Sequence, residues 1–477
     1  MKHIVSLTLA FCMALSLFTV GVSADAPDHA PELAQRTYAI LSENSAGVTI
    51  KAPCAARVLF AVYDARGRML GVSVSDKVAA GQSVDLSVSC VPDKVARGAA
   101  FFLDDNWRPA AEALDVSIPV VSMNEVFGLS KNLRFVENPK TEAELAGNVL
   151  YCFAHGKYEI NLKLSPDMPT SHWSSPNVKS VANSLPELAG MFSNQRLQFR
   201  CENNKLVFWY DGRSDLSAVE PAACYERQKQ AYFKALEIHD QLHESGKITD
   251  GMTQRQIAQV YYDYMVAKNV GPAHGPDGTV AEKVFDDSAY AALCTNAADC
   301  VGRAAAFNML LHTEGIACCG VSGQLGGGHV LNYMVLDGTP YLGDWGNRMG
   351  MAPVKSFSNR FVPEKLSLEF AERVIKGDYS GLLLGAPMTV KLAGDKKLTV
   401  TVPSLEGAEL DDIRFRFDSD RVGNTARGSA LSLSGSTLTV DLSGFNLSDE
   451  QWESILNTGW FRLEIKSCYW HAPSLTK

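Results

Sequence analysis

One cysteine and one histidine stand where they could form a nucleophilic site. Cys300 follows the polar step from Asn296 to Asp299 and precedes the small, apolar run of a buried helix. A thiol at a helix N-terminus ionises readily, because the partial positive charge there stabilises the thiolate. His329 opens a later predicted strand, directly after the glycine-rich stretch 323–328. An imidazolium brought beside the sulfur by folding would complete an activated thiol.

The turn Asp337-Gly338 adds a carboxylate to this pair. Asp-Gly between two apolar runs is a strong hairpin signal, and a two-residue loop there sets Leu331 opposite Asp344. Residues two apart on a strand share a face, so His329 and Asp344 lie on the same face, diagonally across the hairpin. A carboxylate in that place would hold the imidazole in one tautomer and stabilise its cation. A three- or five-residue loop would break this parity.

Three helices and several strands must position these side chains. A helix is expected over 222–246, and Thr253 with Gln256 forms a capping box that begins the next one. The third helix begins near Cys300 and stops at Gly315. The hairpin described above follows this helix along the chain.

β patterning flanks this middle part. Residues 45–120 alternate apolar and polar side chains in short strands between turn signals, which is typical of a β-sandwich and resembles small immunoglobulin-like modules of bacterial surface proteins. Residues 125–220 mix strands with a helix predicted over 179–192. Residues 386–477 return to strands with one short helix, and we interpret them as a C-terminal β-sandwich.

The composition excludes some classes of protein. A length of 477 residues is too great for one core and suggests about three domains. The net charge of −9 argues against a nucleic-acid partner. Residues 1–24 carry an early lysine, an apolar core and a small-residue cleavage site, so they predict a secretory signal peptide. We therefore expect a secreted, extracellular protein with no transmembrane segment after cleavage.

Eleven cysteines are present, and loss of the signal peptide leaves ten. An exported chain can form disulfides, and Cys54 and Cys90 fall in one predicted β-domain where they could bridge. Cys300 alone could equally be a buried structural thiol, or could pair with one of its neighbours in sequence: Cys294, Cys318 or Cys319. Its arrangement with the histidine and the aspartate favours the catalytic interpretation.

The run 289–323, followed by 329–345, resembles the motifs of the transglutaminase-like superfamily. The likeness covers about 225–350, and it implies an α+β core related to papain-like cysteine proteases, which we place at 222–385 between the immunoglobulin-like β-sandwich domains. Carried over from the family, the site residues that the resemblance implies are Cys300 as nucleophile, His329 as general base and acid, and Asp344 as orienting carboxylate. The chemistry implied is attack on an amide through a thioester, with no cofactor and no metal.

The sequence departs from the family pattern at several positions. Val330 and Leu331 follow the histidine where an aromatic is common, Arg303 replaces another aromatic, and Pro340 and Gly343 are unusual in the aspartate strand. These departures alter the shape of the pocket, so the family pattern does not identify the substrate. The backbone N–H of the nucleophilic cysteine could contribute an oxyanion donor, but no oxyanion side chain is identified.

We therefore predict a bacterial transglutaminase-like cysteine hydrolase or acyltransferase that acts on amide bonds of a protein or peptide substrate, and we favour the peptidase over cross-linking. The β-domains would contact a cell surface or glycan. The alternative is a catalytically inactive surface-binding or adhesion protein that retains the fold.

A pair of histidines on the first helix invites a different interpretation. His239 and His243 are four residues apart, so one helix face presents both. Zinc proteases of that pattern need glutamate after the first histidine, and here Asp240 stands there. The pattern thus favours a solvated helix face over a metal site. The tryptophans at 452, 460 and 470 are expected in the core of the last domain, with a carbohydrate-binding face as the alternative.

Overall fold

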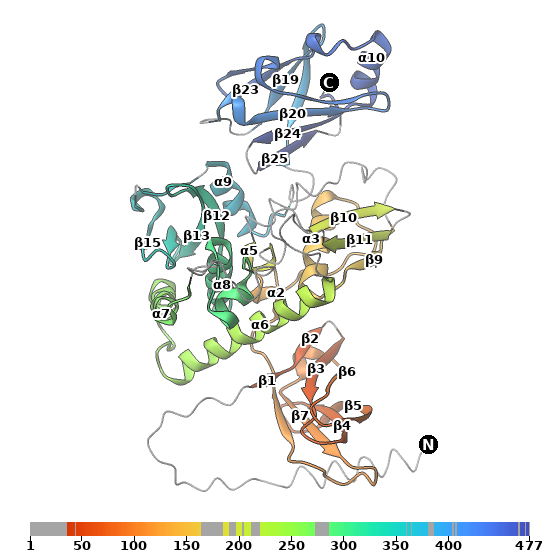
Figure 1. The fold of residues 1–477 in the computed structure, drawn as a ribbon, viewed down its shortest axis with the longest axis vertical. Coiled ribbons are helices and arrows are strands. Elements are labelled where there is room, and N and C mark those ends of the chain that lie inside the picture. The colour runs from red at the N-terminus through yellow and green to blue at the C-terminus, as the bar shows by residue number, and fades with distance from the viewer. Residues whose placement is uncertain are drawn as a thin grey trace. The chain divides into compact units, whose positions relative to one another are not determined.

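The computed structural model describes residues 36–476 apart from 43, 164–184, 190–196, 203–204, 211–219, 272–285, 359, 364, 380–385, 403–404, 406–407, 466–467 and 473. The predicted signal peptide lies outside these residues, and so does most of the helix expected over 179–192. The described chain is mixed α+β, as predicted (Figure 1).

Two sheets form the N-terminal part. One has the order β2-β3-β6, with strands Ile40–Ser42, Ser45–Lys51 and Ser83–Ser89. The other has the order β1-β8-β7-β4-β5, with strands Thr37–Tyr38, Leu114–Ser117, Arg97–Leu103, Ala56–Tyr63 and Met69–Val78. Alternate residues of β3 are buried, and Val48, Ile50 and Phe60 share one core. The predicted strands are present, and the kinship with immunoglobulin-like modules stays a prediction.

The segment that follows is mixed, as the sequence predicts. Its helices are α2 (Met123–Val126), α3 (Glu142–Ala154) and α5 (Pro186–Ala189). Its sheet has the order β10-β11-β9, with strands Leu197–Glu202, Lys205–Tyr210 and Glu159–Asn161. Thr141 and Glu144 form a capping box at the start of α3, which satisfies backbone donors that a helix start leaves free.

The middle of the chain contains the predicted helices. They are α6 (Pro221–Glu244), α7 (Gln254–Lys268), a π-helical turn η4 (Ala291–Thr295), α8 (Cys300–His312) and α9 (Lys365–Val374). The capping box of Thr253 and Gln256 is confirmed at the start of α7. One sheet has the order β15-β14-β13-β12-β16, with strands Gly350–Pro353, Thr339–Asp344, Gly328–Leu336, Cys318–Gln324 and Val362–Pro363.

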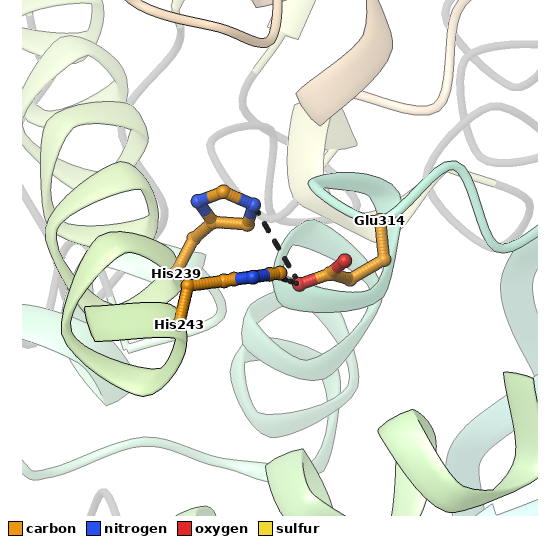
Figure 2. Close-up of side chains that lie close together, drawn as sticks. All are labelled: His239, His243 and Glu314. Carbon is orange, nitrogen blue, oxygen red and sulfur yellow. Dashed lines mark hydrogen bonds and ion pairs between the residues drawn. The ribbon is translucent and has the colours of Figure 1, made fainter. Parts of the chain in front are cut away.

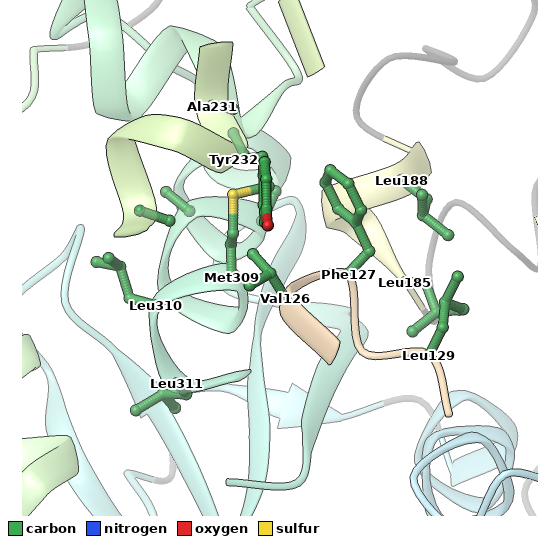
Figure 3. Close-up of a cluster of buried hydrophobic side chains, with 14 of the residues drawn as sticks. Val126, Phe127, Leu129, Leu185, Leu188, Ala231, Tyr232, Met309, Leu310 and Leu311 are labelled. Atoms are coloured by element: carbon green, nitrogen blue, oxygen red, sulfur yellow. The ribbon is translucent and has the colours of Figure 1, made fainter. Parts of the chain in front are cut away.

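Helix α8 is buried along most of its length. Its residues from Ala304 to His312 are buried, and α6, α7, β12 and β13 all pack against it. Figure 3 shows Met309 of α8 close to Tyr232 of α6 and Val126 of α2. Burying a large apolar side chain contributes about 1.5–3 kcal/mol, so packing from several sides fixes this helix firmly. The position of Cys300 therefore depends on the core.

Successive residues of β12 point into two different cores. Cys318 packs with α8, whereas Cys319 and Val321 pack with Ala371 of α9. A strand with apolar residues at consecutive positions is expected where both faces of a sheet are covered. The sheet therefore lies between α8 and α9.

The C-terminal part also consists of two sheets. One has the order β17-β25-β24-β20-β21, with strands Ala386–Pro387, Cys468–Ala472, Trp460–Ile465, Ile413–Asp418 and Gly423–Ala426. The other has the order β18-β19-β23-β22, with strands Thr389–Gly394, Lys397–Thr401, Thr437–Asp441 and Leu431–Ser434. The predicted short helix is α10 (Asp449–Thr458). Trp460 and Trp470 are buried, as predicted.

The structure does not contain the Cys54–Cys90 bridge that the sequence left possible. Both cysteines are free thiols, and Cys54 Sγ instead approaches the Ala110 carbonyl oxygen at 3.7 Å. Cys300 is also a free thiol, so it is not paired with Cys294, Cys318 or Cys319. Within the described residues, no helix is both long enough and apolar enough to cross a membrane.

Candidate active site

Helix α8 begins at Cys300, as predicted, and Asp299 is its N-cap. The Asp299 Oδ1 atom accepts a hydrogen bond from the Gly302 N–H at 3.0 Å. A side chain at position 302 would not fit, because its Cβ would lie 2.6 Å from the Asp286 carbonyl oxygen. The helix start is thus held by a cap and by close backbone packing. The N–H of the first helical residue has no acceptor within the helix.

The β13–β14 hairpin has the predicted register. Leu336 pairs with Thr339 across the Asp337-Gly338 turn, and Asn332 pairs with Gly343 farther along the strands. His329 Nε2 and Asp344 Oδ2 are 2.8 Å apart, so the two side chains lie on one face and are hydrogen bonded. Their side chains are 12% and 7% exposed, which shields the pair from water.

Two residues that the sequence analysis missed hold this pair. Asn347 donates to Asp344 twice, from its backbone N–H to Oδ1 at 3.0 Å and from Nδ2 to Oδ2 at 2.8 Å. The ring of Phe361 lies edge-on to the His329 ring at 6.1 Å between centroids. Asn347 follows Asp344 by three residues in a turn, a local signal that could have been recognised. Nothing local in the sequence points to Phe361.

Gly323 makes room for Phe361. It lies opposite His329 in the β12–β13 pair, and a Cβ there would lie 2.3 Å from Phe361 Cζ. The glycine that ends the Val321-Ser322-Gly323 motif therefore allows an aromatic ring to pack against the imidazole. The ring limits the orientations that His329 can adopt.

Cys300 and His329 are hydrogen bonded to each other, and their pKa values move in opposite directions. Burial opposes ionisation of Cys300, but the hydrogen bond with His329, that with the Val330 backbone and the charge of His329 together bring the pKa of the thiol below its ordinary value. Burial likewise opposes protonation of His329, yet its bonds to Asp344 and Cys300 raise the pKa of the imidazole to about 9. Both shifts favour the ion pair, with the proton on the ring and the sulfur as a thiolate, over the neutral pair.

The other members of the site fit this ion pair. Burial tends to raise the pKa of Asp344, but the hydrogen bonds from His329 and Asn347 outweigh it and lower that pKa. Elsewhere, burial is the main cause that raises the pKa of Cys152 to about 12 and those of Cys318 and Cys319 well above their ordinary values. Cys300 differs from these buried thiols because it is hydrogen bonded to the His329 imidazole.

A cavity of about 290 Å³ opens onto the sulfur. Its walls come from the start of α8, from β13 and from the turn after β14: Ala298, Asp299, Cys300, Arg303, Ala304, His329, Val330, Leu331, Asn332, Asp344, Trp345 and Asn347. All three predicted site residues line it. The cavity can therefore bring a substrate group to the thiolate and the imidazolium together.

Arg303, which departs from the family pattern, joins three segments around this cavity. Its guanidinium donates to the carbonyl oxygens of Ala298 at 3.1 Å, Gly346 at 3.2 Å and Val270 at 3.2 Å. Trp345 Nε1 returns a hydrogen bond to the Arg303 carbonyl oxygen at 3.1 Å. The arginine thus ties the helix start to the turn that follows Asp344. The sequence alone did not reveal this function, because its partners are backbone atoms of distant segments.

Comparisons with known proteins add little to this geometry. No protein-family model matches the chain, and no curated protein matches it. Among solved structures, the chain has a weak structural similarity to red sea bream transglutaminase, with 9% sequence identity, a TM-score of 0.21, and coverage of 92% of this chain and 81% of that one.

Proposed function

We propose that this protein is a transglutaminase-like cysteine hydrolase or acyltransferase that acts on amide bonds of proteins or peptides. The observation that carries the proposal is the continuous hydrogen-bonded relay from Cys300 through His329 to Asp344, at the edge of a cavity. An ionised sulfur, a protonated ring and an orienting carboxylate are the groups that cysteine acyl transfer requires.

Acylation begins with attack of the Cys300 thiolate on the amide carbonyl carbon, which forms a C–S bond and places negative charge on oxygen. The N–H at the start of α8 is the donor that we assign to this oxyanion. His329 then gives its proton to the departing nitrogen, the C–N bond breaks, and a thioester remains. Asp344 keeps the ring oriented and stabilises its cation until the proton leaves.

Deacylation reverses these roles. Neutral His329 accepts a proton from the incoming nucleophile, which attacks the thioester carbon and expels the thiolate, and the ion pair is restored. Water would release a carboxylic acid, whereas an amine would form a new amide. We favour water, so peptide-bond hydrolysis is the preferred form of the reaction.

The proposal is tested with peptides and a matched variant. Wild-type protein and Cys300→Ala are incubated with a mixed peptide library, with and without an excess of a primary amine. Peptide fragments in the wild type alone would support hydrolysis, and amine incorporation would support transfer. If the two proteins give identical product profiles, the Cys300 thiol performs no acyl transfer.

A second function rests on a different region. The C-terminal part contains a cavity of about 440 Å³ lined by Arg414, Arg416, Arg427 and Arg462, together with Asn424, Thr425 and Glu464. Arginine forks bind carboxylate, sulfate or phosphate groups through paired hydrogen bonds. An inactive central domain with a working β-domain would then bind an acidic glycan. Retention on a sulfated polysaccharide column that falls with salt, with no turnover of any peptide, would favour this alternative.

We also propose that the protein is exported and that residues 1–24 are removed. The support is the signal-peptide pattern of the sequence. Amino-terminal sequencing of protein from the culture supernatant should begin at Asp25. Recovery of the whole chain in the cytosol, with its initiating segment intact, would contradict export.

A further inference from the structure

The sequence predicts that the two histidines of α6 lie on a solvated face. The structure contradicts this prediction. Their rings meet the carboxylate of Glu314, which follows α8, and Figure 2 shows the three side chains converging. His243 Nε2 is 2.9 Å from Glu314 Oε1, and His239 Nε2 is 3.6 Å from the same atom. The side chains of His239 and Glu314 are only 13% and 9% exposed. The expectation is wrong because the end of α8 packs over this face of α6, a contact between segments far apart in sequence.

The surrounding residues orient this cluster. Asp240 Oδ1 lies 3.0 Å from His239 Nδ1, so a proton on Nδ1 leaves the Nε2 lone pair directed at Glu314. The second oxygen of Asp240 accepts a hydrogen bond from the Tyr38 hydroxyl at 2.8 Å. The buried Tyr261 hydroxyl donates to Glu314 Oε1 at 2.8 Å. A carboxylate behind a histidine and a donor behind a carboxylate are the outer groups that commonly fix metal ligands.

The chemistry of the three inner groups points to a cation. A lone pair on His239 Nε2 and an anionic Oε1 on Glu314 both present electron density to the space between them. In a tetrahedral zinc centre with bonds of about 2.0–2.1 Å, neighbouring ligand atoms lie about 3.3 Å apart, and the observed 2.9 and 3.6 Å lie on either side of that value. The ligand atoms of all three residues lie within 4.8 Å of one another. Two imidazoles favour zinc over calcium or magnesium.

We propose that His239, His243 and Glu314 bind one Zn²⁺ ion. The His243 side chain is 36% exposed, so water can reach the ion and complete its coordination. Asp240 would then act as the outer carboxylate that fixes the His239 tautomer.

The position of this zinc site indicates what it does. Helix α8 has 13 residues, so at a rise of 1.5 Å per residue its two ends lie about 20 Å apart. Cys300 lies at one end and Glu314 follows the other. A zinc ion at this distance takes no part in the reaction of the thiol. It links α6 to the end of α8 and so stabilises the helix that carries Cys300. This inference does not depend on the proposed enzymatic function.

The experiment uses full-length protein with Cys300→Ala as the background, because this removes the activated thiol as a competing zinc ligand. Protein freed of metal with a chelator is titrated with Zn²⁺ alone, and the dissociation constant is measured by competition with a chromophoric chelator. One zinc ion per chain is expected. The substitutions His243→Gln and Glu314→Gln should each weaken binding at least 100-fold, and Asp240→Asn should weaken it about 10–100-fold. Gln241→Ala, at an exposed position on the same helix, is the matched control and should leave affinity within twofold.

A second measurement distinguishes this site from the free cysteines. Co²⁺ bound in place of zinc should give the visible absorption of a four-coordinate ion without a thiolate-to-cobalt charge-transfer band. His243→Gln should fold, because the side chain is partly exposed, and circular dichroism checks this. Equal zinc affinity in the Cys300→Ala background and in its His243→Gln and Glu314→Gln derivatives would overturn the proposal and leave the cluster as a hydrogen-bonded link between helices. A thiolate band would overturn it as well, because the metal would then be bound by cysteine.

Failure of this inference is distinguishable from failure of the proposed function. Labelling of Cys300 by iodoacetamide is measured in the wild-type protein. The zinc-bound and zinc-free proteins are compared at a temperature where both are folded. We expect labelling rates within twofold of each other and a higher melting temperature with zinc. A labelling rate that changed tenfold would contradict the assignment of the ion to a remote, stabilising site.

Discussion

The two ends of helix α8 carry similar groups and support different chemistry. At the start of the helix, the Cys300 thiol meets the His329–Asp344 pair, whose closest atoms are 2.8 Å apart. Past its end, Glu314 meets His239 and His243, with a closest approach of 2.9 Å. Each end thus joins an imidazole to a carboxylate. The third group differs, because it is a thiol at one end and a second imidazole at the other.

This difference decides what each end can do. A thiol that shares a proton with an imidazole becomes a nucleophile, and at this end a cavity lies beside it. Two imidazoles and a carboxylate directed at one point offer lone pairs, which suit a metal ion better than a carbon centre. Both ends of α8 therefore contain a histidine–carboxylate pair. The third group at each end decides whether that end suits covalent chemistry or metal binding.

The largest expected effect is a loss of turnover that leaves the other end of α8 unchanged. Replacement of Cys300 by alanine removes the nucleophile, so turnover of any accepted peptide should fall by about 10⁴-fold or more. Zinc affinity at the other end should stay within twofold. Steady-state kinetics and metal titration of the same preparation measure both. Residual turnover above a tenth of the wild-type rate would mean that another group attacks the substrate.

Substitution of Asp344 tests the histidine–carboxylate pair at the start of α8. Asp344→Asn keeps the shape but removes the negative charge that helps raise the pKa of His329 to about 9. That pKa should fall, and turnover should drop by about 10²-fold, since the imidazolium is less stable. The measurements are kcat/KM and the NMR titration of the ring. Asp263→Asn, an exposed aspartate on α7, is the control and should behave as wild type.

The helix start can be disturbed without touching a reacting group. Gly302→Ala places a Cβ 2.6 Å from the Asp286 carbonyl oxygen, so the free energy of unfolding should fall by about 1–3 kcal/mol. Gly327→Ala is the control, because nothing lies within 4 Å of its Cβ and its backbone is not left-handed. Urea denaturation of both variants measures the effect. Equal stability of the two would show that the helix start can shift freely.

The dependence on pH gives the smallest effect. The pKa of Cys300 is lowered, so its thiolate persists as the pH falls and is lost only below that pKa. The pKa of His329 is raised to about 9, so the imidazolium is lost as the pH rises through 9. Turnover needs both and should decline on each side, with half of the rate lost near pH 9. His329→Ala should slow iodoacetamide labelling at pH 6, since it removes the hydrogen bond and the charge that lower the pKa of the thiol. An unchanged labelling rate would contradict the ion pair.

Features with local signals were predicted well. The polar step before Cys300 marks the start of α8, and the Asp337-Gly338 turn sets the register that brings His329 to Asp344. A disulfide between Cys54 and Cys90 was possible from the sequence but is not formed, because membership of one β-domain does not fix the distance between two side chains. Arg303 looked like a loss from the family pattern, whereas its guanidinium binds three carbonyl oxygens of separate segments.

The sequence by itself determined the elements that depend on neighbours within a few residues: where α8 starts, where the hairpin turns and which side chains share a strand face. Only the tertiary structure decided that Phe361 packs on the His329 ring and that Glu314 meets two histidines of α6. The physical reason is the range of the forces involved. Caps and turns are formed by hydrogen bonds within a few residues, whereas contacts between distant segments depend on how whole helices and sheets pack.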